Sequence, residues 1–393
     1  MSTLSFNELK TAYAHKTDKE IRFTQLVFTL LHYPWLVKIL SRAAKLILQY
    51  NLPFKGIIRS TVFKVFCSGE NEAEAFQTIR HLHDYRVMAV LDYVSEGEKS
   101  EEAFSRNAEK IIANINAEVN GTKADFISVK LTGLEDPDFL TQINHTHNQL
   151  SSSQQNRYNR FRKHVEDICR AAAEKNIMVY IDAEETWMQE VIDSLTEQMM
   201  KQFNHEKVIV FNTLQMYRTD RVAYLQAAIA RARQYKYLCG IKLVRGAYLE
   251  KETRHAAEVG LPNPVFEKKS DTDKSFNTAT EICLQNHDVV VTCIASHNEE
   301  SVQYAIDCLK KYNVTNPMEK LQFSQLYGMS DHITFNLAAH GYHASKYLPY
   351  GEVEKAIPYL MRRAEENTSV NGQMNRELDM LKKEMKRRQH SDD

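Results

Sequence analysis

Two adjacent arginines, Arg362 and Arg363, lie in the segment YLPYGEVEKAIPYLMRRAEEN over residues 347–367. The segment is typical of a short aromatic strand, a turn at 349–351, and a helix on which both arginines and Glu366 fall within about one turn. Because guanidinium groups present planar, bidentate donors, the arginine pair suits a small carboxylate. The alternative is a solvated helix face with one i,i+4 ion pair between Arg362 and Glu366.

Other polar side chains stand where nearly continuous apolar runs end. Such a polar and cationic set suits a ligand with several anionic groups, held by point charges and backbone amides without a P-loop. The members are Glu96, Lys130, Asp182, Gln215, Lys242, Arg245, Ser296, His297, Asn298, Gln325, Tyr327 and Tyr347.

Asp182 is the member of this set whose position is most informative. It stands between two apolar residues, so its carboxylate needs a partner. Lys130, on the neighbouring predicted strand, is the natural one, although a lone strand lysine can also be a rim residue whose ammonium group reaches water. His297 and Asn298 have a simpler alternative role, because either could cap the helix that follows them.

The apolar runs alternate with amphipathic segments from Met88 onward, a pattern typical of parallel strands covered on both faces. Eight strands, each followed by a helix, predict an α/β fold, a (β/α)8 TIM-like barrel, and no GxGxxG favours an open doubly wound sheet. The predicted helices begin near residues 100, 157, 185, 220, 271, 298 and 331. The predicted strands are 88–94, 125–131, 177–184, 208–215, 238–246, 288–296, 321–328 and 342–350.

The sequence predicts three regions: an N-terminal helical arm or collar over 1–86, the barrel over 87–370, and a charged C-terminal tail over 371–393 that is helical or loosely ordered. Charged residues and a proline interrupt the apolar stretch at 25–50, so it is not a transmembrane helix. A basic amphipathic helix at 36–47 could pack on its own domain or lie on an anionic membrane.

Composition excludes several classes of protein. The formal net charge of −1 argues against a nucleic-acid binder. The N-terminus has no apolar signal core and is too acidic for a mitochondrial transit peptide, so the sequence predicts a bacterial-type cytoplasmic protein. His81 and His83 have the spacing of a metal pair but precede the first strand in a helical register, so no metal site is predicted. Scattered cysteines without a CxxC pair fit a reducing compartment: Cys67, Cys169, Cys239, Cys283, Cys293 and Cys308.

Two segments resemble the signatures of the proline dehydrogenase family of flavoenzymes. They are GIKLVRGAYLEKE over 240–252 and the arginine segment over 347–367. Supporting matches occur in family order across the barrel: SVKL around Lys130, YIDAEE around Asp182, Gln215, ASHN around His297, and LYGM over 326–329.

The resemblance implies a substrate site for L-proline. Arg362 and Arg363 would hold the proline carboxylate, and Lys130 would add a third cation that Asp182 orients. Tyr248 and Tyr347 would wall the ring, with Leu243 beneath it. Family members that prefer hydroxyproline have a serine at the position of Tyr347, so the tyrosine points to proline. Glu96 would pair with Arg362 as a gate that closes the site.

The resemblance also implies an FAD site. Asp182 would border the flavin, and Gln215 and Lys242 would reach its isoalloxazine ring, so Asp182 and Lys242 are the residues closest to the chemistry. The ribityl, phosphate and adenosine portions would meet Arg245, Gly246, Ala247, Lys269, Ser296, His297 and Glu366. The sequence departs from many bacterial relatives at Lys242, where they have arginine, and at Ser296, where threonine is usual. Lysine keeps the cation but loses the bidentate fork.

The implied reaction is hydride transfer from proline to FAD, which yields 1-pyrroline-5-carboxylate. Family members pass the electrons to a membrane quinone, so the resemblance implies peripheral contact with the inner face of the cell membrane. A separate 1-pyrroline-5-carboxylate dehydrogenase would take the product onward. Two alternatives remain open: a barrel aldolase with Lys130 or Lys242 as Schiff-base nucleophile, and a non-catalytic barrel that binds an amino acid.

Overall fold

The computed structural model describes residues 4–33, 35, 37, 55–94, 99–144, 149–369 and 371–390, and the side chains of all of these except 55, 364–369 and 371–374. The predicted basic helix at 36–47 and the predicted gate residue Glu96 therefore lie outside the described residues, as does the side chain of Glu366.

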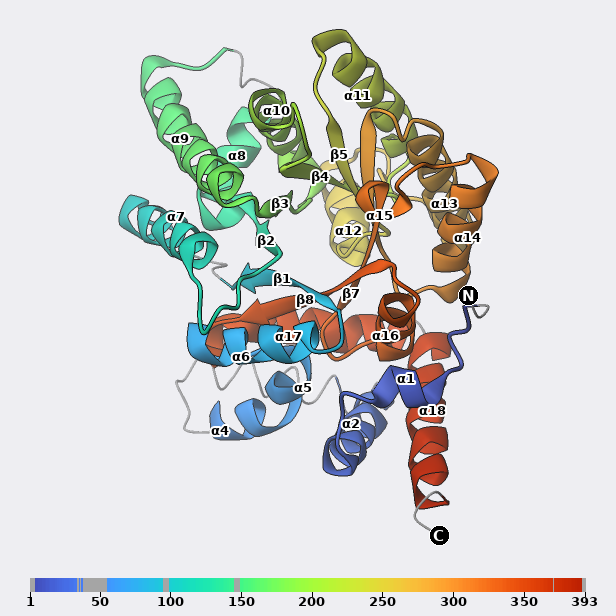
Figure 1. The fold of residues 1–393 in the computed structure, drawn as a ribbon. Helices are drawn as coiled ribbons and strands as arrows, with labels where there is room; N and C mark the ends of the chain where they lie inside the picture. The colour runs from blue at the N-terminus through green and yellow to red at the C-terminus, as the bar shows by residue number, and fades with distance from the viewer. Residues whose placement is uncertain are drawn as a thin grey trace. The chain divides into compact units, whose positions relative to one another are not determined.

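Eight parallel strands form a closed barrel in the order of the sequence (Figure 1). This confirms the predicted (β/α)8 architecture. The strands are β1 (Met88–Tyr93), β2 (Phe126–Val129), β3 (Met178–Ile181), β4 (Val210–Gln215), β5 (Cys239–Val244), β6 (Val290–Ala295), β7 (Leu321–Leu326) and β8 (His343–Tyr350).

The strands end where polar side chains begin. Lys130, Asp182, Arg245 and Ser296 each directly follow the last residue of a strand, and Gln215 is itself the last residue of β4. The prediction that Lys130 lies on a strand was wrong by one residue, because the chain turns there into a 3₁₀ helix, Leu131–Gly133. In barrels of this kind the carboxyl ends of the strands carry the functional groups.

The chain forms two compact units. Unit 1 comprises Met1–Val94, His297–Glu299 and Ser324–Asp393, and unit 2 comprises Ser95–Ser296 and Glu300–Phe323. The predicted domain boundaries at 86 and 370 stay a prediction.

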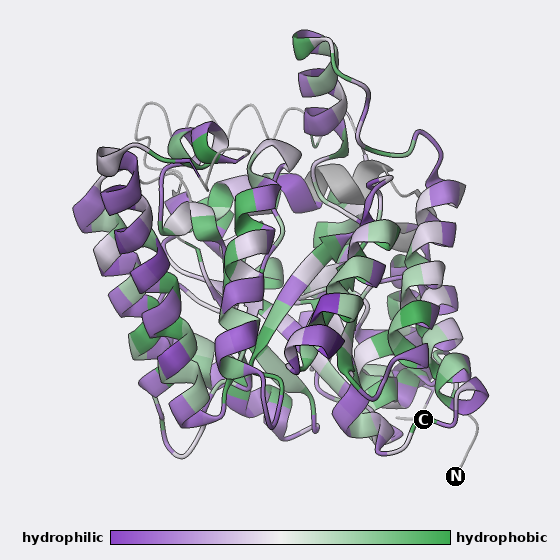
Figure 2. Ribbon diagram, turned by 90° about the horizontal axis from the view of Figure 1, so that it is seen from above, coloured by the Kyte–Doolittle hydropathy of each residue, from purple (hydrophilic) through white to green (hydrophobic). Residues whose placement is uncertain are grey.

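Unit 2 contains β2 to β6 paired in parallel, with Lys242 of β5 in register with Thr213 of β4 and Cys293 of β6. The helices carry hydrophobic residues on one side and hydrophilic residues on the other (Figure 2). They are α7 (Glu101–Asn116), α8 (Pro137–Ile143), α9 (Ser152–Lys175), α10 (Thr186–Phe203), α11 (Arg221–Tyr235), α12 (Leu249–Val259), α13 (Lys269–Gln285), α14 (Glu299–Lys311) and α15 (Pro317–Lys320).

Helices α8, α9, α12 and α15 of unit 2 differ from the prediction, since α8 and α15 were not among the predicted helices. Helix α9 begins five residues before the predicted start, because Ser151 and Gln154 form a reciprocal capping box there. Helix α12 follows β5 and was not predicted. It ends at Gly260, whose φ of +69° is the left-handed conformation typical of a helix C-terminus.

Unit 1 contains β1 and β8, paired in parallel with Val90 opposite Tyr347, and a hydrophobic core to which α1, α2, α17 and α18 contribute. The C-terminal segment is helical and packs on α1 and α2. The helices are α1 (Leu9–Tyr13), α2 (Asp18–Leu31), α4 (Lys55–Ile58), a π-helix (Arg59–Phe63), α5 (Lys64–Phe66), α6 (Glu72–His83), α16 (Asp331–Ala339), α17 (Val353–Ser369) and α18 (Asn371–Gln389).

Three further observations bear on the sequence predictions. His81 and His83 lie on α6, as predicted. All six cysteines are buried free thiols. Within the described ranges, no helix combines the length and the apolar character that crossing a membrane requires.

Candidate active site

Asp182 lies between two lysines in unit 2. Its Oδ1 is 2.7 Å from Lys242 Nζ, and its Oδ2 is 3.4 Å from Lys130 Nζ. Lys242 is only 4% exposed, so its charge depends on this carboxylate. The predicted pairing of Asp182 with Lys130 is confirmed, but the closer partner, Lys242, was not foreseen. These three groups together carry one more positive than negative charge.

Aromatic rings support the ammonium group of Lys242. Its Nζ lies 4.9 Å from the centroid of the Tyr180 ring, a cation–π distance. The Tyr180 ring packs against Phe126 and Phe211 at 5.0 and 5.1 Å, and its hydroxyl donates to Gln322 Oε1 at 3.0 Å. The lysine is therefore held in place by a packed, hydrogen-bonded aromatic layer.

Arg245 is the centre of a second cluster in unit 2. Its guanidinium group donates to Asp273 Oδ1 at 2.8 Å, Ser296 Oγ at 2.7 Å and Ser301 Oγ at 2.9 Å. Lys269 Nζ donates to Asp273 Oδ2 at 2.6 Å. Burial alone would raise the pKa of the Asp273 carboxyl, but hydrogen bonds from Lys269 and Arg245 outweigh it and lower that pKa. Asp273 thus joins the predicted residues Arg245, Lys269 and Ser296.

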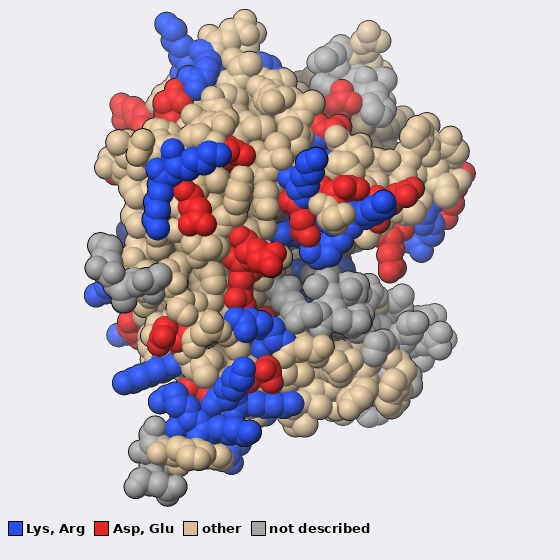
Figure 3. Space-filling view, turned by 90° about the vertical axis from the view of Figure 1, so that its right-hand side faces the viewer, with Lys and Arg blue, Asp and Glu red and all other residues tan. Residues whose placement is uncertain are grey.

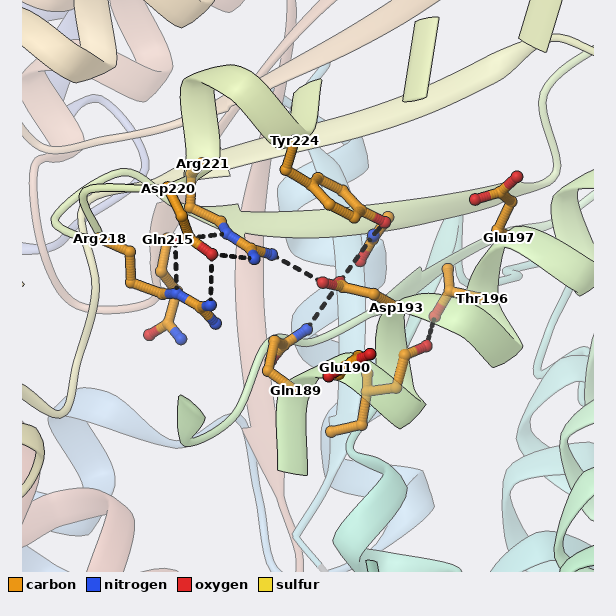
Figure 4. A network of polar contacts seen from close by, with 12 residues as sticks. Gln189, Glu190, Asp193, Thr196, Glu197, Gln215, Arg218, Asp220, Arg221 and Tyr224 are labelled. Atoms are coloured by element: carbon orange, nitrogen blue, oxygen red, sulfur yellow. Dashed lines mark hydrogen bonds and ion pairs between the residues drawn. The ribbon is translucent and has the colours of Figure 1, made fainter. Parts of the chain in front are cut away.

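Gln215 is positioned by a chain of polar contacts behind it, shown in part in Figure 4. Its Nε2 donates to the carbonyl of Glu184 at 2.8 Å, and the amide of Glu184 donates to Gln189 Oε1 at 2.8 Å. Gln189 in turn donates to Asp193 at 2.9 Å, and Asp193 accepts from Arg221 at 2.6 Å in a buried ion pair. The direction of the Gln215 amide is therefore fixed by residues of the loop after β3, of α10 and of α11.

The loop after β5 requires glycine. Gly246 has a φ of +134°, and a Cβ atom there would lie 2.5 Å from the ring of Tyr217. The next residue, Ala247, donates its amide to Gln215 Oε1 at 3.4 Å. Leu243 is fully buried within β5. Because side chains alternate along a strand, it faces away from the side of Lys242, which does not favour its predicted contact with substrate. That contact stays a prediction.

Tyr248 of unit 2 directly precedes helix α12. The other predicted residues described below belong to unit 1. Arg362 and Arg363 are adjacent on α17, as predicted, and Arg363 is only 8% exposed, with its guanidinium group 5.3 Å from the Tyr359 ring centroid. A solvated helix face therefore does not describe Arg363. Tyr347 lies buried on β8, and His297 Nδ1 is 2.9 Å from Ser330 Oγ.

Sequence reasoning missed a buried carboxyl group in unit 2. Glu184 accepts hydrogen bonds from the Thr132 amide at 3.0 Å and from the Thr132 hydroxyl. Burial raises its pKa to about 7, although the Thr132 hydrogen bonds act in the opposite direction. Nothing in the sequence distinguishes Glu184 from the adjacent Glu185, which is the same residue type.

Comparison with known proteins decides the family. The family model described as "Proline dehydrogenase" matches residues 75–376. The chain belongs to this family. It is thus an oxidoreductase of a family whose reaction is proline oxidation in proline catabolism.

Individual relatives agree with this assignment. "Proline dehydrogenase 1, mitochondrial" of Dictyostelium discoideum is 29% identical over 96% of this chain and 74% of its own length. "Carbapenem antibiotics biosynthesis protein CarD" of Pectobacterium carotovorum is 31% identical over 85% of this chain and 86% of its own length. The crystal structure of proline utilization A from Bdellovibrio bacteriovorus, 21% identical, matches with a TM-score of 0.70 over 94% of this chain. The chain spans only 39% of that solved protein, and at 21% identity this likeness shows the fold alone.

The raised pKa of Glu184 predicts that the stability of the protein depends on pH. The Glu184 pKa rises from 4.5 to about 7 on folding, so the folded state holds an extra proton between these values and loses stability as the pH rises through them. We expect the free energy of unfolding to fall by about 2–3 kcal/mol between pH 5 and pH 8 from this group. Glu184→Gln mimics the protonated acid and should lack this part of the dependence in urea unfolding.

The matched variant is Thr132→Val, which removes the hydroxyl that donates to the ionised carboxylate. It should move the loss of stability to higher pH. Parallel stability curves for the wild type and Glu184→Gln would contradict the assignment.

Proposed function

We propose that this chain oxidises L-proline to 1-pyrroline-5-carboxylate, with FAD as the hydride acceptor and a membrane quinone as the final acceptor. The observation that carries the proposal is the family match across residues 75–376. The cluster of Lys242, Asp182 and Lys130 at the strand ends of unit 2 supports it.

The residues of unit 2 fit a flavin. FAD, when bound, supplies the electron acceptor and gains negative charge as it takes up hydride. Lys242 and Lys130 exceed Asp182 by one positive charge, and a buried cation is the group that stabilises such a gain. Gln215 presents an amide whose direction is fixed, and Arg245 is braced by three hydrogen bonds.

On this proposal the isoalloxazine ring meets Asp182, Gln215 and Lys242. Other residues meet the rest of the cofactor: Arg245, Gly246, Ala247, Lys269, Ser296, His297 and Glu366. Gly246 is suited to this position because its backbone has a positive φ that residues with a Cβ atom rarely adopt.

The proline carboxylate is held by Arg362 and Arg363, with Lys130 as a further cation. The burial of Arg363 supports this assignment, because a buried guanidinium group binds a carboxylate far more strongly than an exposed one. Tyr248 and Tyr347 bound the ring. The bulk of Tyr347 leaves less room for a hydroxyl group than a serine would. Glu96 closes the site by pairing with Arg362.

These residues act by positioning and by charge. Hydride leaves the ring carbon beside the nitrogen, which requires an unprotonated amine and an approach of about 3–3.5 Å to the acceptor. The arginines fix the carboxylate end of the rigid ring, and the tyrosines fix its plane. The product carries a carbon–nitrogen double bond and opens to an aldehyde, which a separate 1-pyrroline-5-carboxylate dehydrogenase oxidises.

The structure disfavours the aldolase alternative. Schiff-base formation needs a neutral lysine amine, whereas Lys242 and Lys130 both form ion pairs with Asp182. A non-catalytic amino-acid-binding barrel would need the residues that bind the substrate carboxylate. It would not require the Gln215 and Arg245 clusters, which are assigned to the cofactor.

The central test is an absorbance spectrum recorded before and after anaerobic addition of proline. We expect the purified protein to be yellow and its flavin band to bleach, because proline delivers two electrons to the cofactor. Proline binding without bleaching would favour the non-catalytic barrel. A colourless protein that borohydride traps with a carbonyl substrate would favour the aldolase.

Arg363→Met should raise the KM for proline by about 100-fold, since a carboxylate would lose a buried charged partner. Flavin content, measured by absorbance, should not change. Arg363→Lys is the matched variant, and it should give an intermediate KM because it keeps the charge without the fork. An unchanged KM in Arg363→Met would place the carboxylate elsewhere.

A surface of unit 1 suits contact with the membrane that holds the quinone. Helix α2 and the residues after it expose Leu26, Leu30, Tyr33 and Trp35, and α2 packs on α18. Lys and Arg side chains gather at the lower end of one face (Figure 3), where Figure 1 shows α18. The exposed lysines of α18 are Lys382, Lys383 and Lys386. Apolar and basic groups together favour an anionic bilayer surface.

The chain should therefore co-sediment with anionic vesicles at low salt after reduction by proline. Replacing Lys382, Lys383 and Lys386 with glutamine should weaken binding roughly 100-fold, at about 1 kcal/mol per lysine. Neutral vesicles serve as the control. Absence of binding to anionic vesicles at low salt would exclude this surface.

A further inference from the structure

Ser330 has a backbone conformation that its residue type disfavours. It directly precedes helix α16, is fully buried, and has φ and ψ of 52° and 42°. A residue other than glycine in this left-handed region is uncommon and persists when its surroundings hold it there. The contacts of Ser330 show which residue does so.

Glu377 of helix α18 holds Ser330. One oxygen, Glu377 Oε1, accepts both the Ser330 amide at 2.8 Å and the Ser330 hydroxyl at 3.2 Å. The Glu377 side chain is only 6% exposed. The preceding residue, Arg376, donates to Glu299 Oε2 at 2.9 Å. Helix α18 is thus tied to two neighbouring parts of unit 1, the loop before α16 and the loop of residues 297–299.

The Ser330 hydroxyl also contacts the ring of His297, with Oγ 2.9 Å from Nδ1. A hydroxyl has one proton to donate, and here that proton is directed to Glu377. Oγ must then accept from His297, which requires a proton on Nδ1. In a neutral imidazole with its proton on Nδ1, the second ring nitrogen, Nε2, is an acceptor.

We propose that Glu377 is a positioning residue that acts through Ser330 to hold His297 in the Nδ1-protonated form. The neutral imidazole then presents Nε2 to a hydroxyl or amino donor of a ligand, a role that rests on the proposed function for FAD. Glu377 lies on a helix that begins within the family match and continues past its end at residue 376. The contact therefore comes from a part of the chain that the family match does not cover.

The test is nitrogen-15 NMR of histidine-labelled protein, because the shifts of the two ring nitrogens report which one carries the proton. The His297 signals are assigned by their loss in His297→Gln. The wild type should show a protonated Nδ1. Ser330→Gly should abolish this preference while retaining the fold, since glycine adopts the left-handed conformation readily.

Two variants of α18 separate positioning from general stability. Glu377→Gln keeps an acceptor oxygen and should keep the Nδ1 signature, whereas Glu377→Ala should lose it. Glu384→Ala is the matched control, because Glu384 is buried on the same helix but bonds to Arg387 and Arg388. It should leave the His297 signals unchanged.

A titration of FAD into cofactor-free protein supplies the second readout. Ser330→Gly and Glu377→Ala should weaken FAD binding about tenfold, as expected for one lost hydrogen bond, while Glu377→Gln should match the wild type. A wild type protonated on Nε2, or an Nδ1 signature that survives Ser330→Gly, would overturn the proposal. A wild type that binds no FAD would overturn the proposed function, while the NMR result would still decide the role of Glu377.

Discussion

The structure of the candidate site depends on one requirement, that a buried charge must have an opposite charge beside it. Asp182 and Lys242 are both withdrawn from water, and either one alone would be costly to bury. Their contact fixes the end of β3 relative to the end of β5 within unit 2. Lys130 then adds a second cation to the same carboxylate, so the position of three strand ends is set by one acid group.

A similar requirement holds for the polar side chains near Asp182, which need hydrogen-bond partners when they are buried. Gln215 and Arg245 are also functional candidates, and each is held by hydrogen bonds to other groups of the protein. Gln215 depends on a chain that ends in the Asp193–Arg221 ion pair, and Arg245 depends on Asp273 and two serines. Such supporting contacts limit the motion of a side chain before any ligand arrives, which lowers the entropy lost on binding.

The sequence predicted the parts of the fold that local pattern controls. All eight strands were found, because parallel strands buried on both faces form continuous apolar runs. Strand ends were less accurate, as at Lys130, because a turn can replace the last residue of an apolar run. Of the two lysines that contact Asp182, the sequence predicted Lys130 and did not predict Lys242. Lys130 was expected because it belongs to the neighbouring predicted strand, whereas the closer approach of Lys242 depends on the reach of its side chain in three dimensions.

Other features could not be predicted from the sequence. Ser330 follows the LYGM match but nothing in the sequence marks it, and the charged C-terminal segment does not indicate that Glu377 and Glu384 are buried. Helix α12 was not predicted, although it begins inside the 240–252 signature. For Ser330 and Glu377 the deciding factor is their contact with each other, 47 residues apart in the sequence.

The burial of all six cysteines has a chemical consequence. The thiolate is the form that peroxides attack, and burial keeps these groups as thiols by raising the pKa of Cys293 to about 11 and that of Cys239 to about 12. A protein that handles reducing equivalents in the presence of oxygen is exposed to peroxide at its own surface. Burial therefore disfavours cysteine oxidation in this chain, both as a route of damage and as a means of control.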